Sequence, residues 1–272
     1  MAIALAAALA ACGGGDHGNA AAGKQFTYGA PATASTDEAN AVNASITRAQ
    51  GLKSSPDENA AQTFADFSAV TSTLLGAPEV NSSIAVSPSA DRTALFVARR
   101  AGVAATTGSF QNPGCVTKTP TSLTLSGCKV VVTDTDGTTI TVTADGSLLA
   151  AVDTLSWDLT VRVGLSGSPQ GLSGNASVHD SGKVTVTATT ATGAMRRETG
   201  ATASYSGQSA SVGLDESLDF DVTYDSAIPC VTGGTLEAKR VWTQRPQNVP
   251  VKDRGAKVTW SGCGIATIQL SN

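Results

Sequence analysis

The chain has 272 residues, a formal net charge of −4 and only 4% aromatic residues. Proteins that bind nucleic acid neutralise phosphates with Lys and Arg and stack bases on aromatic rings, and a net negative chain without such a surface does not fit that role. The chain holds only two histidines, so acid–base catalysis would have to depend on carboxylates. The composition excludes a nucleic-acid partner and gives no support to an enzyme.

Residues 1–11 are uncharged and form a short apolar run that ends in small side chains. A helix that spans a bilayer needs about 20 apolar residues. A shorter apolar run that ends in small residues is typical of a secretory signal segment and its cleavage site. The tetrapeptide Leu9-Ala10-Ala11-Cys12 resembles the lipobox of bacterial lipoproteins. In that family the cysteine thiol receives a diacylglyceryl group, and the cysteine becomes the first residue of the mature protein.

The resemblance implies that residues 1–11 are a signal peptide and that Cys12 is the lipidation site, which anchors the protein in the membrane of a bacterial cell envelope. Gly13 stands where members of the family retained at the inner membrane carry aspartate, so the resemblance implies the outer membrane. Residues 12–34 are rich in Gly and Ala. This composition is typical of a flexible tether, which would hold the body on the order of 25 Å from the membrane.

Residues 35–107 are predicted to form two or three helices. The segment 35–38 has the form of a capping box and is followed by apolar residues at helical spacing. A second helix is expected to begin with Pro56 in its first turn and to end at Gly76. Ser87-Pro88 opens a third, shorter helical pattern.

The segment 108–272 changes to a period of two, in which apolar residues alternate with polar ones, most clearly in 157–165 and 218–225. Turns are expected at 134–137 and at Asp145-Gly146. Alternation without intervening helices predicts a mainly β protein built on an antiparallel meander. The apolar side of the meander must be covered by closure into a half-barrel or barrel, by folding into a sandwich, or by the preceding helices.

Four further cysteines occur in two similar settings. Cys115 and Cys230 are each followed by Val-Thr, and Cys128 and Cys263 are each preceded by Ser-Gly. Four cysteines allow three connectivities, and the repeated frame favours the local pairs Cys115–Cys128 and Cys230–Cys263. A zinc site is the alternative, but the spacings are far from those of zinc ligands. We expect two disulfides, formed in an oxidising compartment, and no metal site.

His179-Asp180-Ser181 places three triad residue types in a row. A triad is defined by the geometry between side chains, and neighbours in sequence point in different directions. We therefore expect a turn here and assign no catalytic residue.

The last third of the chain holds an acidic strand followed by a basic segment. The acidic residues are Asp215, Asp219, Asp221 and Asp225. The basic residues are Lys239, Arg240, Arg245, Lys252, Arg254 and Lys257. The carboxylates suggest a calcium site and the cations an anionic headgroup or glycan phosphate. The favoured interpretations are a solvated acidic face and neutralisation across neighbouring strands, where each opposite-charge pair contributes a few tenths to about 1 kcal/mol.

The sequence predicts no cofactor and no enzymatic activity. The favoured function is an envelope lipoprotein, anchored through Cys12, with a non-enzymatic binding or structural role toward an envelope protein or an apolar ligand. Helices before a long meander resemble the half-barrel lipoprotein carriers, so a carrier of lipid with an apolar cavity is the first alternative. An envelope hydrolase that uses carboxylates of shifted pKa is the second.

Overall fold

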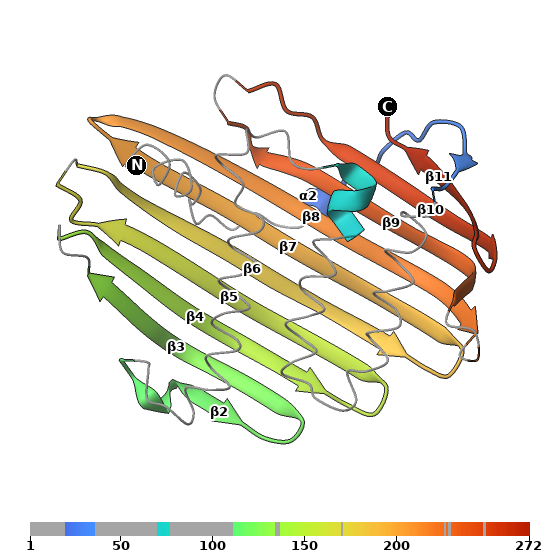
Figure 1. Cartoon of the computed structure of the whole chain (residues 1–272), viewed down its shortest axis with the longest axis horizontal. Helices are drawn as coiled ribbons and strands as arrows, with labels where there is room; N and C mark the ends of the chain where they lie inside the picture. Colours follow the sequence, from blue (N-terminus) through green and yellow to red (C-terminus); the bar gives the residue numbers. More distant parts are fainter. Residues whose placement is uncertain are drawn as a thin grey trace.

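The computed structural model describes residues 20–35, 70–76, 111–133, 137–169, 171–225, 227, 230–246 and 249–272. These residues form one sheet of 11 strands in the order β1-β11-β10-β9-β8-β7-β6-β5-β4-β3-β2 (Figure 1). Each strand from β2 to β11 lies beside its neighbour in sequence, and all pairs are antiparallel. The mainly β class and the meander are confirmed. The sheet is unclosed, which excludes the closed barrel among the predicted architectures.

The strands are β1 (Ala32–Thr33), β2 (Val116–Lys118), β3 (Ser122–Thr133), β4 (Thr139–Ala150), β5 (Thr154–Ser166), β6 (Ser173–Val186), β7 (Thr190–Tyr205), β8 (Gln208–Asp225), β9 (Cys230–Gln244), β10 (Arg254–Gly262) and β11 (Ile265–Leu270). Two short helical elements are α2 (Ala20–Gly23) and η3 (Pro113–Cys115), and residues 70–75 are also helical. Strands β3 to β9 have 12 to 18 residues each, well above the usual five or six.

The two faces of the sheet differ in chemistry because side chains alternate along each strand. Leu218, Val222 and Tyr224 of β8 point to one face, here called the apolar face, and Asp215 and Ser217 point to the other, the polar face. The core on the apolar face includes Leu148, Leu155, Trp157, Met195, Leu236 and Val258. Residues of the helix 70–75 belong to the same core cluster, so this helix packs on the apolar face.

The N-terminal segment does not behave as the predicted tether over residues 20–34. Ala21 of α2 is fully buried and lies against β8 and β9. Farther along, β1 pairs with β11, and the backbone N–H groups of Gly29 and Ala34 donate to carbonyls of β11 at 2.9 and 3.0 Å. The prediction is wrong here because the small side chains that favour a coil also let the chain lie close against a sheet.

The two predicted turns have different outcomes. The β3–β4 hairpin predicted around 134–137 is confirmed by the pairing of Thr133 with Thr139, while residues 134–136 themselves lie outside the described residues. Asp145-Gly146 instead lies inside β4, and Gly146 has φ +126°. A Cβ at Gly146 would lie 2.0 Å from the carbonyl oxygen of Asp158 in β5. The glycine is needed for the close approach of two strands, so the turn prediction is wrong.

The predicted helices are described only in part. Residues 70–75 are helical and Gly76 has φ +73°, so the expected end of the second helix is confirmed. The start of that helix and the first and third predicted helices lie outside the described residues. Residues 1–11 and Cys12 also lie outside them.

Candidate functional site

Both predicted disulfides are present. Cys115 of η3 is joined to Cys128 of β3, with a Cα–Cα distance of 5.1 Å. Cys230 at the start of β9 is joined to Cys263, which lies between β10 and β11, with a Cα–Cα distance of 5.6 Å. Both distances lie within the usual range for disulfides. The pairing favoured by the repeated sequence frame is therefore confirmed.

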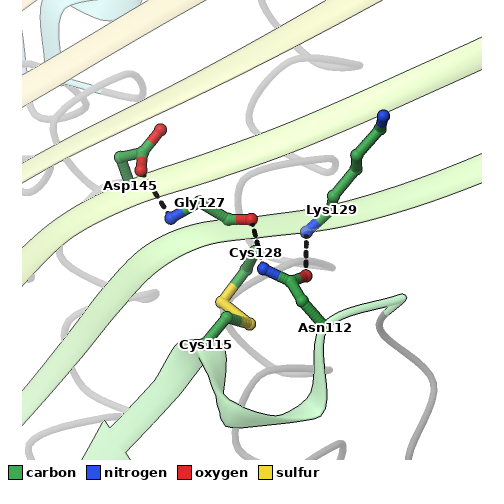
Figure 2. The surroundings of a disulfide bond; sticks show 6 residues. All are labelled: Asn112, Cys115, Gly127, Cys128, Lys129 and Asp145. Atoms are coloured by element: carbon green, nitrogen blue, oxygen red, sulfur yellow. Dashed lines mark hydrogen bonds between the residues drawn. A yellow bond between two sulfur atoms is a disulfide. The ribbon is translucent and has the colours of Figure 1, made fainter.

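The Asn112 side chain forms hydrogen bonds with the backbone of β3 beside the first disulfide (Figure 2). Its Nδ2 donates to the carbonyl of Gly127 at 2.7 Å, and its Oδ1 accepts from the N–H of Lys129 at 3.0 Å. Gly127 has φ +60° at a bulge in β3, and its N–H donates to Oδ1 of Asp145 at 2.6 Å. The Asp145 side chain thus satisfies the Gly127 donor at the bulge, and Asn112 satisfies groups on the edge side of β3 beyond the start of β2.

Asp215 fixes the N-terminal segment to the middle of the polar face. Its side chain is 1% exposed and accepts a hydrogen bond from the N–H of Ala21 at 2.9 Å. Arg196 of β7 binds both Asp215 oxygens, through Nε at 3.0 Å and Nη2 at 2.8 Å. Nη2 also lies 2.7 Å from a carboxylate oxygen of Glu198. Asp215 is an anchor for α2, and the expectation that it belongs to a solvated face is wrong.

A second contact holds the N-terminal segment at β9 and β10. The phenol of Tyr28 donates to Oε1 of Glu237 at 2.6 Å, and Nζ of Lys239 lies 3.1 Å from Oε2 of the same carboxylate. Phe26 and Tyr28 lie over Gly255, where a Cβ would come within 2.9 Å of a Phe26 ring carbon and of the Tyr28 hydroxyl oxygen. Burial, the hydrogen bond to Glu237 and its charge all raise the pKa of Tyr28. The phenol therefore stays a neutral donor.

Ser217 and Asp219 lie beside these contacts on β8. The Ser217 hydroxyl is buried and has no hydrogen-bond partner in the described part of the chain. Burial raises the pKa of Asp219, an effect that the charge of Glu237 reinforces and that of Lys239 opposes. Asp221 and Asp225 are exposed, so the solvated face predicted for the acidic strand is confirmed for its second half only.

Asp253, just before β10, forms ion pairs with Lys24 and Arg245, which lie far apart in the sequence. One carboxylate oxygen lies 3.4 Å from Nζ of Lys24, and the other lies 3.4 Å from Nη2 of Arg245 and accepts from the N–H of Trp242 at 3.0 Å. The Asp253 side chain is 16% exposed, whereas Lys24 is 43% and Arg245 56% exposed. Lys252 is exposed beside them. The carboxylate points inward and the cations outward.

A row of charged residues crosses the apolar face. Direct cross-strand partners from β6 to β10 are Asp180, Arg197, Glu216, Arg240 and Arg254. The first four are buried. Nε of Arg197 donates to Asp180 at 2.7 Å, and Nε of Arg240 donates to Glu216 at 2.7 Å. Because β8 and β9 are neighbours, the predicted neutralisation of the basic segment by the acidic strand is confirmed for Glu216 and Arg240.

The same row binds the end of the helix 70–75. Nη1 of Arg240 donates to the carbonyl of Gly76 at 2.7 Å, and Nη1 of Arg254 donates to that of Leu75 at 3.3 Å. Arginine there satisfies carbonyls that have no partner within a helix and complements the helix dipole. Figure 1 shows α2 and this helix at the same central strands, and their contacts place them on opposite faces.

Sequence reasoning missed this row, although each strand carried a signal for it. Asp180, Arg197, Glu216 and Arg240 each stand at a position whose parity belongs to the apolar face. One charged residue at such a position indicates a buried partner, because an unpaired buried charge is costly. The partners themselves follow only from the register between strands.

His179, Asp180 and Ser181 lie inside β6, so the turn predicted for them is wrong. Nε2 of His179 lies 2.9 Å from Asp158 and Nδ1 lies 3.9 Å from Glu198, on the polar face. Asp180 points to the apolar face and binds Arg197. The three residue types are therefore not assembled into a triad.

Within the ranges that the structure describes, no group of three His, Cys, Asp or Glu side chains is placed to hold a metal ion. None of the described helices has the length and hydropathy to cross a membrane. The chain matches no protein-family model, no curated protein and no solved structure. The fold defines it as an open antiparallel meander with two disulfides, whose polar face carries its own N-terminal segment.

Proposed function

We propose that the protein is a lipoprotein of the bacterial cell envelope, anchored through Cys12 in the outer membrane, with a non-enzymatic binding or structural role. The observation that carries the proposal is the pair of disulfides, Cys115–Cys128 and Cys230–Cys263. Disulfides persist in oxidising compartments and are rare in the cytosol. They support export, which is also what Leu9-Ala10-Ala11-Cys12 predicts.

The arrangement of charged side chains supports a non-enzymatic role. Both oxygens of Asp215 are taken by Arg196 and Ala21, and the carboxylate of Glu216 is held by Arg240. These groups stabilise the contact between helical segments and the sheet. A catalytic acid or base needs an approach for substrate, and these carboxylates are engaged in buried structural contacts.

Expression of the full chain in a bacterium with two membranes tests the anchor. We expect the protein in the outer-membrane fraction and a diacylglyceryl group on the N-terminal peptide that begins at Cys12. The Cys12→Ser variant should lose both, and Gly13→Asp should move the protein to the inner membrane. An unmodified Cys12 in the mature chain would contradict the proposal.

Native mass spectrometry of the same detergent-solubilised chain tests the role. A mass that accounts for the lipidated polypeptide alone supports a binding or structural module. An additional lipid-sized mass that organic solvent extracts, and that stays when the detergent is exchanged, would favour the carrier and contradict the proposed role.

A further inference from the structure

The site where the chain leaves the sheet toward Cys12 is fixed. Ala20 begins α2, and Ala21 is held on Asp215, so eight peptide units separate Cys12 from the first residue of the folded body. A fully extended chain of that length reaches at most about 29 Å, and a flexible coil of the same length spans about 16 Å on average. A lipid on Cys12 would therefore hold the polar face at β8 and β9 close to the headgroups.

The surface next to that exit is basic. Lys24, Arg245 and Lys252, here called the Lys24 patch, are exposed, and Asp253, which pairs with Lys24 and Arg245, lies mostly buried beneath. Lys24, Arg245 and Asp253 together carry a net charge of +2 − 1 = +1, and Lys252 adds a further exposed cation. Lys24 is only four residues from Ala20, so the chain toward Cys12 leaves from the edge of the patch.

The charge of the Lys24 patch and its position near Cys12 both favour an anionic membrane as the partner. The field of an anionic membrane attracts each nearby Lys or Arg and decays within a Debye length of about 8–10 Å. The short connection to Cys12 can bring the patch within that distance without being stretched. Gly213 of β8 pairs with Gln244, next to Arg245, whereas Asp225 pairs with Cys230 at the other end of β9. The exposed residues Asp221 and Asp225 therefore lie toward the end of β8 away from the patch, and the polar face is charged asymmetrically.

We propose that the Lys24 patch docks the protein on anionic lipid headgroups, with the polar face at β8–β10 turned toward the membrane. The proposal rests on the lipid anchor at Cys12 that is proposed above. Docking gives the anchored sheet a preferred orientation, in which its apolar face and the helix 70–75 point away from the bilayer.

The test uses the full lipidated chain, reconstituted in vesicles of phosphatidylcholine with or without phosphatidylglycerol. The rate of amine acylation is measured by mass spectrometry for Lys24 and Lys252, with exposed Lys118, at the far edge of the sheet, as the internal reference. On anionic vesicles we expect Lys24 and Lys252 to react about tenfold more slowly than on neutral ones, with the difference lost at high salt. The reference Lys118 should react at equal rates on both vesicle types.

Two variants of equal charge change sharpen the test. Lys24→Gln/Arg245→Gln should abolish most of the protection of Lys252, whereas Lys118→Gln/Lys129→Gln, at the far edge of the sheet, should leave it unchanged. Equal acylation rates on both vesicle types, or protection that survives Lys24→Gln/Arg245→Gln, would overturn the docking. Protection by inorganic phosphate in detergent, equal to that on anionic vesicles, would identify a free-anion site and also overturn it.

The N-terminal peptide in the same digest separates the two proposals. A lipidated Cys12 together with unprotected lysines overturns the docking alone. A Cys12 without lipid removes the anchor and the docking together.

Discussion

Removing Glu216 should destabilise the fold more than removal of any exposed charge, because it leaves a buried cation without its carboxylate. The Arg240 side chain is 2% exposed, and Glu216 → Ala would leave its guanidinium with the carbonyl of Gly76 as acceptor. Breaking a buried ion pair in this way costs about 3–5 kcal/mol. The double variant Glu216→Leu/Arg240→Met removes both charges. Its free energy of unfolding should fall by only about 1 kcal/mol, because the hydrogen bond to Gly76 is also lost.

Urea unfolding of the oxidised chain measures both variants. Arg162→Ala is the matched control, because the Arg162–Asp145 pair is exposed and worth about 0–1 kcal/mol. We expect the single Glu216 variant to lose at least about 3 kcal/mol and the double variant to recover most of it. A loss for Glu216→Ala no greater than for Arg162→Ala would refute the reasoning, as would a double variant as unstable as the single one.

Three further changes are measured by the same unfolding assay. Gly146→Ala should lower the free energy of unfolding by at least about 3 kcal/mol, because φ is +126° and the new Cβ would overlap β5. The control Gly114→Ala, whose Cβ meets open space, should be nearly neutral, and equal losses for the two variants would contradict this. Replacing Cys230 and Cys263 by Ser opens a bridge across 33 residues and should cost about 4 kcal/mol; an unchanged midpoint would show that the bridge does not restrict the unfolded chain. Asp219→Asn should stabilise the protein at neutral pH, because burial raises the pKa of the folded carboxyl, so its ionisation weakens the fold as pH rises. The advantage should vanish in acid, where the parent is protonated too, and an advantage that persists there would have another cause.

The sheet was predictable because one of its faces is buried. A buried face forces apolar residues to every second position, as in β8, and this signal needs no knowledge of the neighbouring strands. Asp145-Gly146 was misread because a positive φ serves a hairpin turn and a close approach inside a strand equally well. Only the neighbouring strand distinguishes the two, and the local sequence does not contain it.

The contacts of the N-terminal segment were not predictable in the same way. Asp215 lies 194 residues from its partner Ala21, and Glu237 lies 209 residues from Tyr28. Such partners depend on which strand a short segment reaches in space. The disulfides are the opposite case, since a repeated local frame around Cys115 and Cys230 indicated the pairing.

The attachment of Ala21 at the centre of the sheet also determines how the protein bears mechanical load. A pull on the N-terminus reaches the hydrogen bond from Ala21 to Asp215 before it reaches the edge strand β1. Asp215 belongs to β8, which is paired along most of its length with β7 and β9, so tension is transferred to strands that are supported on both sides. An edge strand pulled directly would peel away one hydrogen bond at a time. Here β1 is shielded from that force for as long as α2 holds.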